Sequence, residues 1–345
     1  MKTLYGLLIA LLISAGAIAL LCYSPERQVK NGFNRKDIYI AKKLNELDMK
    51  YNSYFISGLS DSRIFLGNYN APLRLFGCSY SLTDTRYEKI PFTYSSKINW
   101  QLAKMQVDSP WLYLTEYKTP SFVSAKVPFK NERNHILQSI QAELILALSP
   151  NSVIINGYDA ELKQKVLQKI TLQPKLNQTN KHAHQSQQDG SFSIDGFMFL
   201  NKEKGTILFV YYYRNDFVCL DTNLNLRYTG KTIDTNSKAK IKVAEIEKDG
   251  KKLRTLAAPP LYVNKRGYSN GNYIYIQSAL MADNENKEKF KQHEVIDVYL
   301  QDNGEYSHSI YLPKYKDKKL TGFAVRGRAL IALHERYLIK YSIRD

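Results

Sequence analysis

Residues 63–80 read RIFLGNYNAPLRLFGCSY: an apolar run, a tyrosine, a short turn with a proline, and a second apolar run. The same phrase recurs in looser form five more times in the 345-residue chain. The six copies of its first half are IFLGNYNAP (64–72), LYLTEYKTP (112–120), VIINGYDAE (153–161), LFVYYYRND (208–216), YIYIQSALM (273–281) and LIALHERYL (330–338). Their starts lie 41 to 65 residues apart, so the chain contains an internal repeat of irregular length.

Each copy has further strand-like runs beside it. Such runs precede the copies at 53–59, 191–200, 259–267 and 321–327, and follow them at 73–80, 216–223, 294–301 and 337–343. A fourth run, 306–312, follows the turn Asn303-Gly304. The chain has 26 Tyr and 14 Phe against 5 Met, which favours strands. Four short antiparallel strands per repeat are typical of propeller blades, so the sequence predicts an all-β, six-bladed β-propeller of four-stranded antiparallel blades.

A ring of blades leaves no sheet with an uncovered face, but its last blade must be completed. Residues 320–345 contain only three strand candidates. We expect the segment DIYIA (37–41) to supply the missing outer strand and so to close the ring. The competing architectures are a seven-bladed ring and a β-sandwich with insertions. Residues 127–142 favour a short helix, and the polar residues 175–190 favour a mobile loop between the third and fourth blades.

The N-terminus differs from the rest of the chain. Residues 4–23 carry no charge and are long enough to cross a bilayer. They suit either a retained anchor or an export signal cleaved after Ala15-Gly16-Ala17, although the basic residues that follow favour the cytoplasmic side. We therefore predict a signal peptide or membrane anchor helix (1–24), a basic juxtamembrane linker (25–36) and a propeller domain (37–345). The expected location is the cell envelope, inner-membrane-anchored or periplasmic, with the propeller outside the cytoplasm.

The folded part contains two cysteines. Cys78 lies in the predicted third strand of the first blade and Cys219 in that of the fourth. These blades face each other across a six-membered ring, whereas a disulfide needs Cα atoms within about 7 Å. We expect both thiols to be unpaired and buried.

The formal charge is +17, and basic residues crowd 238–254 and 314–319. Such a charge attracts anionic surfaces such as phospholipid head groups, acidic polysaccharide or nucleic acid, or it simply keeps a surface solvated. If the chain is exported, nucleic acid is not an expected partner. The membrane is a partner through residues 4–23 if they are not cleaved.

Three stretches have a more specific pattern: IFLGNYNAPLRLF (64–76), LDTNLNLRYTGKTID (220–234) and VIDVYLQDNGEYSHSIYLP (295–313). With them, the chain from about residue 37 to its end resembles the TolB-like six-bladed β-propeller proteins, in particular uncharacterised bacterial envelope members with one N-terminal hydrophobic segment. The resemblance implies a fold. It implies no catalytic residue and no cofactor.

Two patterns contain metal-ligand residue types. His182-x-His184 offers two imidazoles, but it lies in a Gln/Asn/Lys-rich stretch with only Asp189 as a carboxylate. Asp221-x-Asn223-x-Asn225 has the oxygen spacing of a calcium loop, but Leu226 stands where that loop needs glycine, so the same residues suit an ordinary hairpin. We predict no metal and no cofactor.

In a propeller, the loops after each second strand emerge at one face of the ring. The predicted ligand-binding residues on that face are Tyr69, Asn70, Tyr117, Lys118, Tyr158, Asp159, Tyr213, Arg214, His334 and Glu335. Tyrosines with mixed charges suit a sugar, a peptide or a partner protein, because tyrosine combines a flat apolar ring with a hydroxyl. The alternative is a framework role, in which the tyrosines pack between blades and the polar residues cap turns.

The sequence thus predicts a non-enzymatic envelope propeller that binds an unknown ligand, protein or carbohydrate through one loop face. The alternative is a metal-dependent propeller hydrolase or lactonase with carboxylates around the central channel. A third hypothesis is an anchored scaffold that faces the cytoplasm. No Gly-rich phosphate loop, nucleophile elbow or CxxC pair points to another enzyme class.

Overall fold

The computed structural model describes residues 5–6, 10–11, 13–16, 30–92, 98–137, 141–172, 177–187, 192–248 and 250–344. The chain divides into two compact units, Met1–Asn31 and Gly32–Asp345. Most of the predicted leader (1–24) and part of the linker (25–36) lie outside the described residues, so both stay predictions. Among the helices in the described ranges, none is both long and apolar enough to span a bilayer.

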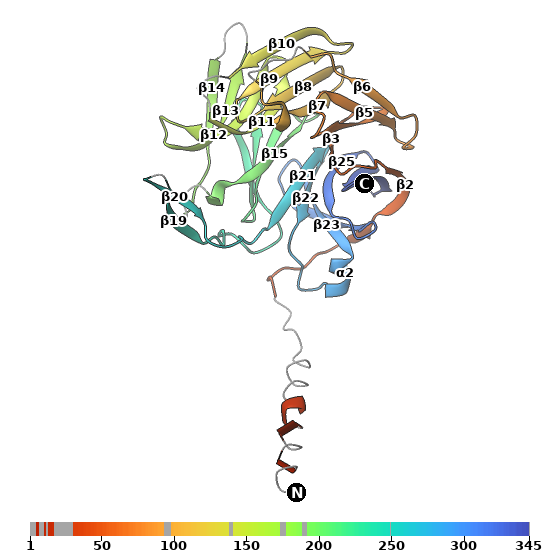
Figure 1. The fold of residues 1–345 in the computed structure, drawn as a ribbon, viewed down its shortest axis with the longest axis vertical. Coiled ribbons are helices and arrows are strands. Elements are labelled where there is room, and N and C mark those ends of the chain that lie inside the picture. The colour runs from red at the N-terminus through yellow and green to blue at the C-terminus, as the bar shows by residue number, and fades with distance from the viewer. Residues whose placement is uncertain are drawn as a thin grey trace. The chain divides into compact units, whose positions relative to one another are not determined.

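Six blades of antiparallel strands and one separate two-stranded hairpin make up the second unit, and the fifth blade carries an added parallel strand (Figure 1). The first blade consists of β3 (Tyr54–Leu59), β4 (Arg63–Asn68), β5 (Arg74–Ser79) and β6 (Arg86–Lys89). The second consists of β7 (Lys104–Asp108), β8 (Trp111–Glu116), β9 (Ser121–Lys126) and β10 (Lys130–Ile136). The third consists of β11 (Gln141–Ser149), β12 (Ser152–Asp159), β13 (Gln164–Thr171) and β14 (Asn177–Ala183). The fourth consists of β15 (Gly196–Asn201), β16 (Thr206–Tyr211), β17 (Asp216–Asp221) and β18 (Leu226–Lys231). The fifth contains β21 (Asn264–Asn270), β22 (Tyr273–Ser278), β23 (His293–Leu300) and β24 (Tyr306–Pro313). The sixth contains β25 (Leu320–Arg326), β26 (Ala329–His334) and β27 (Tyr337–Ser342). The predicted six-bladed, all-β propeller is confirmed.

The repeated phrase marks the second strand of every blade. Its six copies coincide with β4, β8, β12, β16, β22 and β26. In β16, β22 and β26, five of the six residues are buried. A second strand is paired on both edges and covered on both faces by neighbouring blades, so its sequence is a nearly continuous apolar run.

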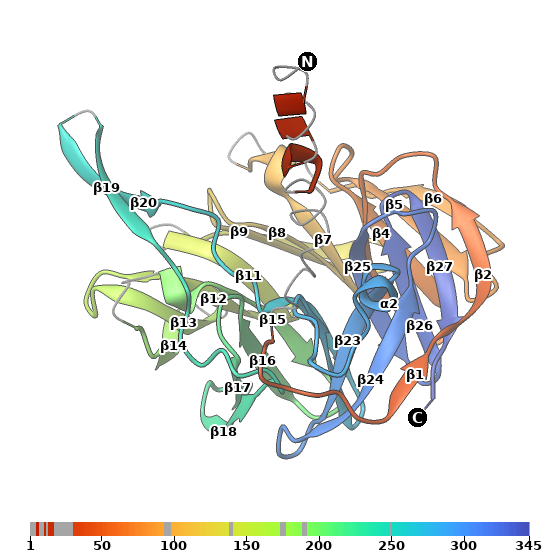
Figure 2. The ribbon, with the colours of Figure 1, turned by 90° about the horizontal axis from the view of Figure 1, so that it is seen from below.

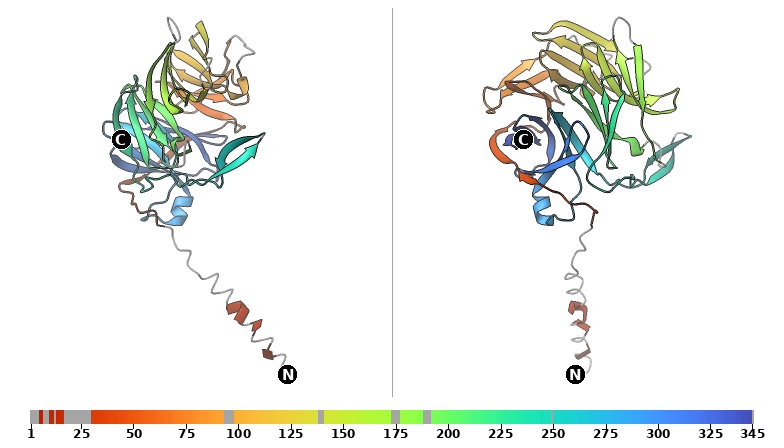
Figure 3. Two further views of the ribbon diagram at one scale, coloured as in Figure 1. Left: turned by 90° about the vertical axis from the view of Figure 1, so that its left-hand side faces the viewer. Right: turned by 180° about the vertical axis from the view of Figure 1, so that it is seen from behind.

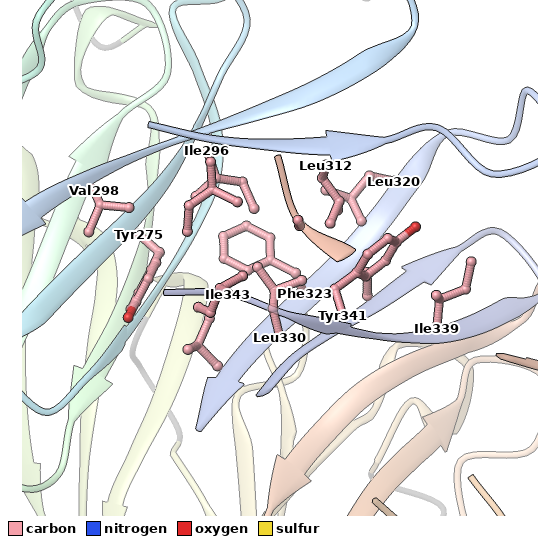
Figure 4. Close-up of a cluster of buried hydrophobic side chains, with 14 of the residues drawn as sticks. Tyr275, Ile296, Val298, Leu312, Leu320, Phe323, Leu330, Ile339, Tyr341 and Ile343 are labelled. Atoms are coloured by element: carbon pink, nitrogen blue, oxygen red, sulfur yellow. The ribbon is translucent and has the colours of Figure 1, made fainter. Parts of the chain in front are cut away.

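Hydrophobic clusters fill the spaces between neighbouring blades. The first strands of neighbouring blades contact one another around the ring, in the order β11, β15, β21, β25, β3 and β7. Between the second and third blades, β8 contacts β11. Figure 4 shows the cluster between the fifth and sixth blades, where Tyr275, Ile296 and Val298 face Phe323 and Leu330. Corresponding clusters join the sixth blade to the first, the first to the second, and so on around the ring.

The N-terminal strands differ from the expected arrangement. β2 (Lys42–Asp48) pairs antiparallel with β27 as the outer strand of the sixth blade (Figure 3, red-orange beside blue). The segment 37–41, which we expected in this place, instead contains β1 (Ile38–Ile40), a fifth strand that runs parallel to β24 on the fifth blade. The prediction was wrong because β2 is mostly exposed and pairs through backbone groups, so its sequence KKLNELD has no apolar pattern.

Two other segments were also assigned wrongly. The expected helix at 127–142 is replaced by β10 and the start of β11. The expected loop at 175–190 contains β14, the outer strand of the third blade, although residues 173–176 and 188–191 lie outside the described residues. Outer strands need no apolar face, which explains why polar sequences form them here.

One hairpin stands apart from the blades. β19 (Val243–Lys248) and β20 (Lys251–Leu256) form a two-stranded sheet that projects from the propeller (Figure 2). It carries the basic stretch 238–254. In the second unit, the helices among the described residues are short: α2 (Lys287–Lys291) and the 3₁₀ turns η1 (Trp100–Leu102) and η2 (Phe192–Ile194).

Candidate functional site

The loops between second and third strands share one end of the ring, which we call the BC face. At this face each loop lies beside the residue that leads into the first strand of its own blade: the Tyr69 amide donates to Ser53 O, and the Tyr212 amide donates to Asp195 O. All ten predicted site residues lie on the BC face, because each follows or ends a second strand. Within the described ranges, no hydrogen bond, ion pair or aromatic pair joins two of the ten from different blades.

The four predicted tyrosines divide into two groups. Tyr69, Tyr117 and Tyr158, on the first three blades, are 44%, 39% and 44% exposed. Tyr213, on the fourth blade, is only 6% exposed. Its ring packs edge-on against Tyr262 at 5.0 Å, and the two hydroxyls lie 3.5 Å apart. Tyr213 therefore has the framework role, and Tyr262, 45% exposed, reaches the surface beside it.

Most of the predicted polar residues hold the fold together. The Asp159 carboxylate is buried and accepts hydrogen bonds from the Glu161 and Leu162 amides and from Gln168 Nε2. The Arg214 guanidinium is buried 3.8 Å above the Tyr211 ring and donates to Gln185 O. In the structure, both therefore act as capping or packing groups.

Of the remaining four polar residues, two are held by contacts within the fold and two have exposed side chains. The His334 imidazole is fully buried between Tyr341 and the Lys318 carbonyl. Glu335, at a left-handed φ of 51°, pairs with Lys318 at 3.2 Å. The Asn70 backbone amide donates to Asn68 Oδ1 and closes a turn, and its side chain is exposed. The Lys118 side chain is also exposed on the BC face.

Two cations near Tyr69 were missed. Lys104 is the first residue of β7, and its Nζ lies 6.0 Å from the centre of the Tyr69 ring. That ring packs at a tilt of 41° against Phe55, with the ring centres 4.6 Å apart. Arg266, near the start of β21, donates to Gln277 Oε1 at 2.8 Å and to Leu320 O. Both cations could have been recognised in the sequence as basic residues near the start of a first strand. Lys104 was missed because the sequence had indicated no first strand for the second blade.

Burial partly desolvates both cations. Burial lowers the pKa of Lys104, even though part of its side chain reaches solvent. Burial also lowers the pKa of Arg266, against the opposing effect of Glu294. Burial raises the pKa of Tyr69, and the nearby Arg266 opposes this shift. Tyr69, Lys104 and Arg266 thus come from three different blades to one place on the BC face.

A cavity of about 850 Å³ lies at the other end of the channel. Every blade contributes to its lining, mainly through the ends of first strands, so it is part of the central channel. We call it the AB cavity, because it opens where the first strands turn into the second. None of its lining residues was among the predicted site residues.

The candidate metal patterns have other roles. The Asp221 carboxylate accepts hydrogen bonds from the Asn223 and Asn225 amides, as in the ordinary hairpin interpretation. His184 is buried between Asn156 Oδ1 at 2.9 Å and the Tyr211 hydroxyl at 3.2 Å. The described part of the chain contains no group of three or more His, Cys, Asp or Glu side chains placed to hold a metal ion.

Comparison with known proteins places the fold among solved propellers. The chain is similar to the crystal structure of a member of the DUF4221 family from Bacteroides vulgatus, with a TM-score of 0.51 and 10% identity over 91% of this chain and 99% of the other. It is also similar to U3-55K (TM-score 0.47, 10% identity, 87% and 98% covered) and to Hsv2 from Kluyveromyces lactis (0.41, 10%, 85% and 70%). No family model matches the chain, and no curated protein matches it either. At such identities the likeness shows the fold alone, and the resemblance to TolB-like proteins stays a prediction.

Proposed function

We propose that the protein is a non-enzymatic propeller of the cell envelope that binds an acidic segment of a partner protein across its BC face. The binding residues are the exposed tyrosines Tyr69, Tyr117 and Tyr158, together with the cations Lys104 and Arg266. The propeller fold itself is compatible with many functions, so the proposal depends on this face.

The observation that carries the proposal is the repeated exposure of large aromatic side chains. Tyrosine occupies the same position in three successive blades, and in each it is about two-fifths exposed. Structural aromatics are normally buried, as Tyr213 is on the fourth blade. Rigid, amphipathic tyrosine side chains are the residue type that anchors protein interfaces.

The charge of the face indicates the chemistry of the partner. Among the described residues, no carboxylate lies within ion-pair distance of Lys104, Lys118 or Arg266. A partly desolvated cation gains more from an incoming carboxylate than a fully hydrated one does. An acidic segment that lies across the tyrosines would bring carboxylates to cations that have none at ion-pair distance among the described residues, and the net charge of +17 assists its approach.

Photo-crosslinking tests the proposal without removing the aromatic rings. Tyr69, Tyr117 and Tyr158 are each replaced by a benzophenone-bearing phenylalanine in the full-length chain expressed in its own cells. Ser62, exposed at the opposite end of the ring, is the control position. We expect one protein to be captured from all three BC-face positions and not from Ser62, and to be captured less from Lys104→Met cells.

Salt provides the second readout. Capture at Tyr117 should fall several-fold between about 50 mM and 500 mM salt, because the Debye length shortens from about 14 Å to about 4 Å. Equal capture from Ser62, or no adduct at any of the three tyrosines, would contradict the proposal.

A further inference from the structure

The AB cavity has the dimensions of a ligand site. Its volume of about 850 Å³ lies in the upper part of the 300–1,000 Å³ typical of small-molecule sites. Serine, asparagine, aspartate and glutamate side chains make up much of its lining, while Leu146 and Phe199 contribute apolar wall. The cavity is separate from the BC face, so an inference about it is independent of the proposed function.

The charges around the cavity mouth neutralise one another between blades. Lys202 Nζ, on the fourth blade, lies 2.6 Å from Asp108 Oδ1 on the second. These two blades are not neighbours, so this pair reaches across the channel. Arg326 of the sixth blade pairs with Asp61 of the first. Both cations among the described lining residues, Lys202 and Arg326, are therefore paired with a carboxylate from another blade.

Glu203 makes the mouth unfavourable for anions. Its Oε1 accepts a hydrogen bond from Asn270 Nδ2 at 3.1 Å, but no cation pairs with it among the described residues. Three carboxylates thus face two cations. An anionic ligand would meet net negative charge, whereas neutral hydroxyl groups donate to carboxylates and accept from the ammonium and guanidinium groups.

Tyr268 supplies a free polar group inside the cavity. Its hydroxyl makes no hydrogen bond to any residue that the structure describes, and Glu203 and Arg326 lie near enough to affect its titration. Burial raises the pKa of Tyr268 to about 12, so the hydroxyl is a proton donor at neutral pH. Phe199 lies in the same wall, where Gly267 leaves room for its ring: a Cβ on Gly267 would come within 2.6 Å of Phe199 Cε1.

We propose that the AB cavity binds a neutral carbohydrate of one or two sugar rings. The Tyr268 hydroxyl and the Lys202–Asp108 pair would hydrogen-bond to its hydroxyl groups, and the half-buried Leu146 and Met198 side chains would pack against the apolar face of a ring. Paired charges beside a partly apolar wall suit a polyhydroxyl compound better than an ion or a purely apolar molecule.

Ligand-observed NMR on the full-length protein tests this site. The probes are glucose, N-acetylglucosamine, maltose, cellobiose and chitobiose, with glucose 6-phosphate as the charged counterpart. We expect at least one neutral sugar to bind with a Kd in the millimolar range or tighter, and glucose 6-phosphate to bind more weakly than glucose. Tyr268→Phe should weaken the best neutral ligand roughly ten-fold, because it removes one buried hydrogen bond.

Two further variants test the site even if Tyr268→Phe is poorly folded. Ser62→Trp, at an exposed position on the mouth, should block entry with little effect on stability, and so should abolish binding. Tyr117→Ala on the BC face should leave sugar affinity unchanged. The proposal is overturned if none of the neutral sugars binds at 50 mM (roughly the upper end of millimolar affinity), if the phosphorylated sugar binds best, or if Ser62→Trp binds as well as the parent.

Discussion

Arg35 and Asp297 form a buried, two-point ion pair although they are 262 positions apart. Arg35 Nε and Nη2 donate to Asp297 Oδ1 and Oδ2 at 2.8 and 3.1 Å, and Nη1 donates to Glu285 Oε2 at 2.6 Å. Burial alone would lower the pKa of Arg35, but Asp297 and Glu285 outweigh it and raise the pKa. The pair joins the segment before β1 to the third strand of the fifth blade.

Arg35→Met should destabilise the propeller by about 3 to 5 kcal/mol, because it leaves buried carboxylates without their cation. Urea unfolding monitored by tyrosine fluorescence measures the loss. The control is Arg336→Met, which removes an exposed ion pair to Asp48 (3.1 Å) and should leave the unfolding free energy close to that of the parent. Equal effects of the two substitutions would show that the buried pair is not a major stabilising contact.

Gly58→Ala should loosen the contact between the first and second blades. Gly58 lies at a register shift in β3, and a Cβ there would come within 2.1 Å of Val107 O on β7. Backbone cannot move aside cheaply, so we expect a loss of about 1 to 3 kcal/mol.

The chain contains a matched control for this substitution. Gly322 lies at the corresponding register shift in β25, and a Cβ there meets nothing within 4 Å. Gly322→Ala should be within about 0.5 kcal/mol of the parent. If Gly58→Ala melts at the same temperature as Gly322→Ala, the close approach of β3 to β7 is wrong.

Acid should destabilise the protein through His184. Burial lowers the pKa of this imidazole from 6.5 to about 3. Between these values the unfolded chain binds one proton more than the folded chain, so the unfolding free energy falls with pH by about 1.4 kcal/mol per unit. Stability is therefore complete above pH 6.5 and is lost progressively below it.

His184→Gln isolates this contribution. Between pH 7 and 5, the variant should lose about 1 to 2 kcal/mol less unfolding free energy than the parent does. Parallel pH profiles for the parent and His184→Gln would contradict the predicted proton uptake on unfolding.

Cys78 and Cys219 should not react in the folded protein. Both are free and buried, as the opposite positions of their blades predicted. Burial raises the pKa of Cys78 to about 11 and raises that of Cys219 as well, so little thiolate forms at pH 8. In a Cys22→Ser chain, an aromatic disulfide reagent should label no thiol before denaturant is added and two thiols afterwards. Rapid labelling in the native state would place at least one thiol at the surface.

The sequence predicted the central strands well and the edge strands poorly. All six second strands were found, because a strand covered on both faces must be apolar along its length. β2, β10 and β14 were missed, since an edge strand is held by backbone hydrogen bonds that any residue except proline makes. The candidate site was equally hard to predict from a local pattern. The repeat places a tyrosine at the same position in four blades, yet Tyr213 is buried while Tyr69, Tyr117 and Tyr158 are exposed.

What the sequence determined by itself is the number of blades, the position of each second strand and the separation of the two cysteines. These follow from a repeat in the order of apolar residues, which is a local property of the chain. Only the tertiary structure decided that Lys104 lies beside Tyr69, that Lys202 reaches Asp108 across the channel and that Arg35 is buried on Asp297. Each of these contacts joins side chains from distant segments, and ring geometry, not local pattern, brings them together.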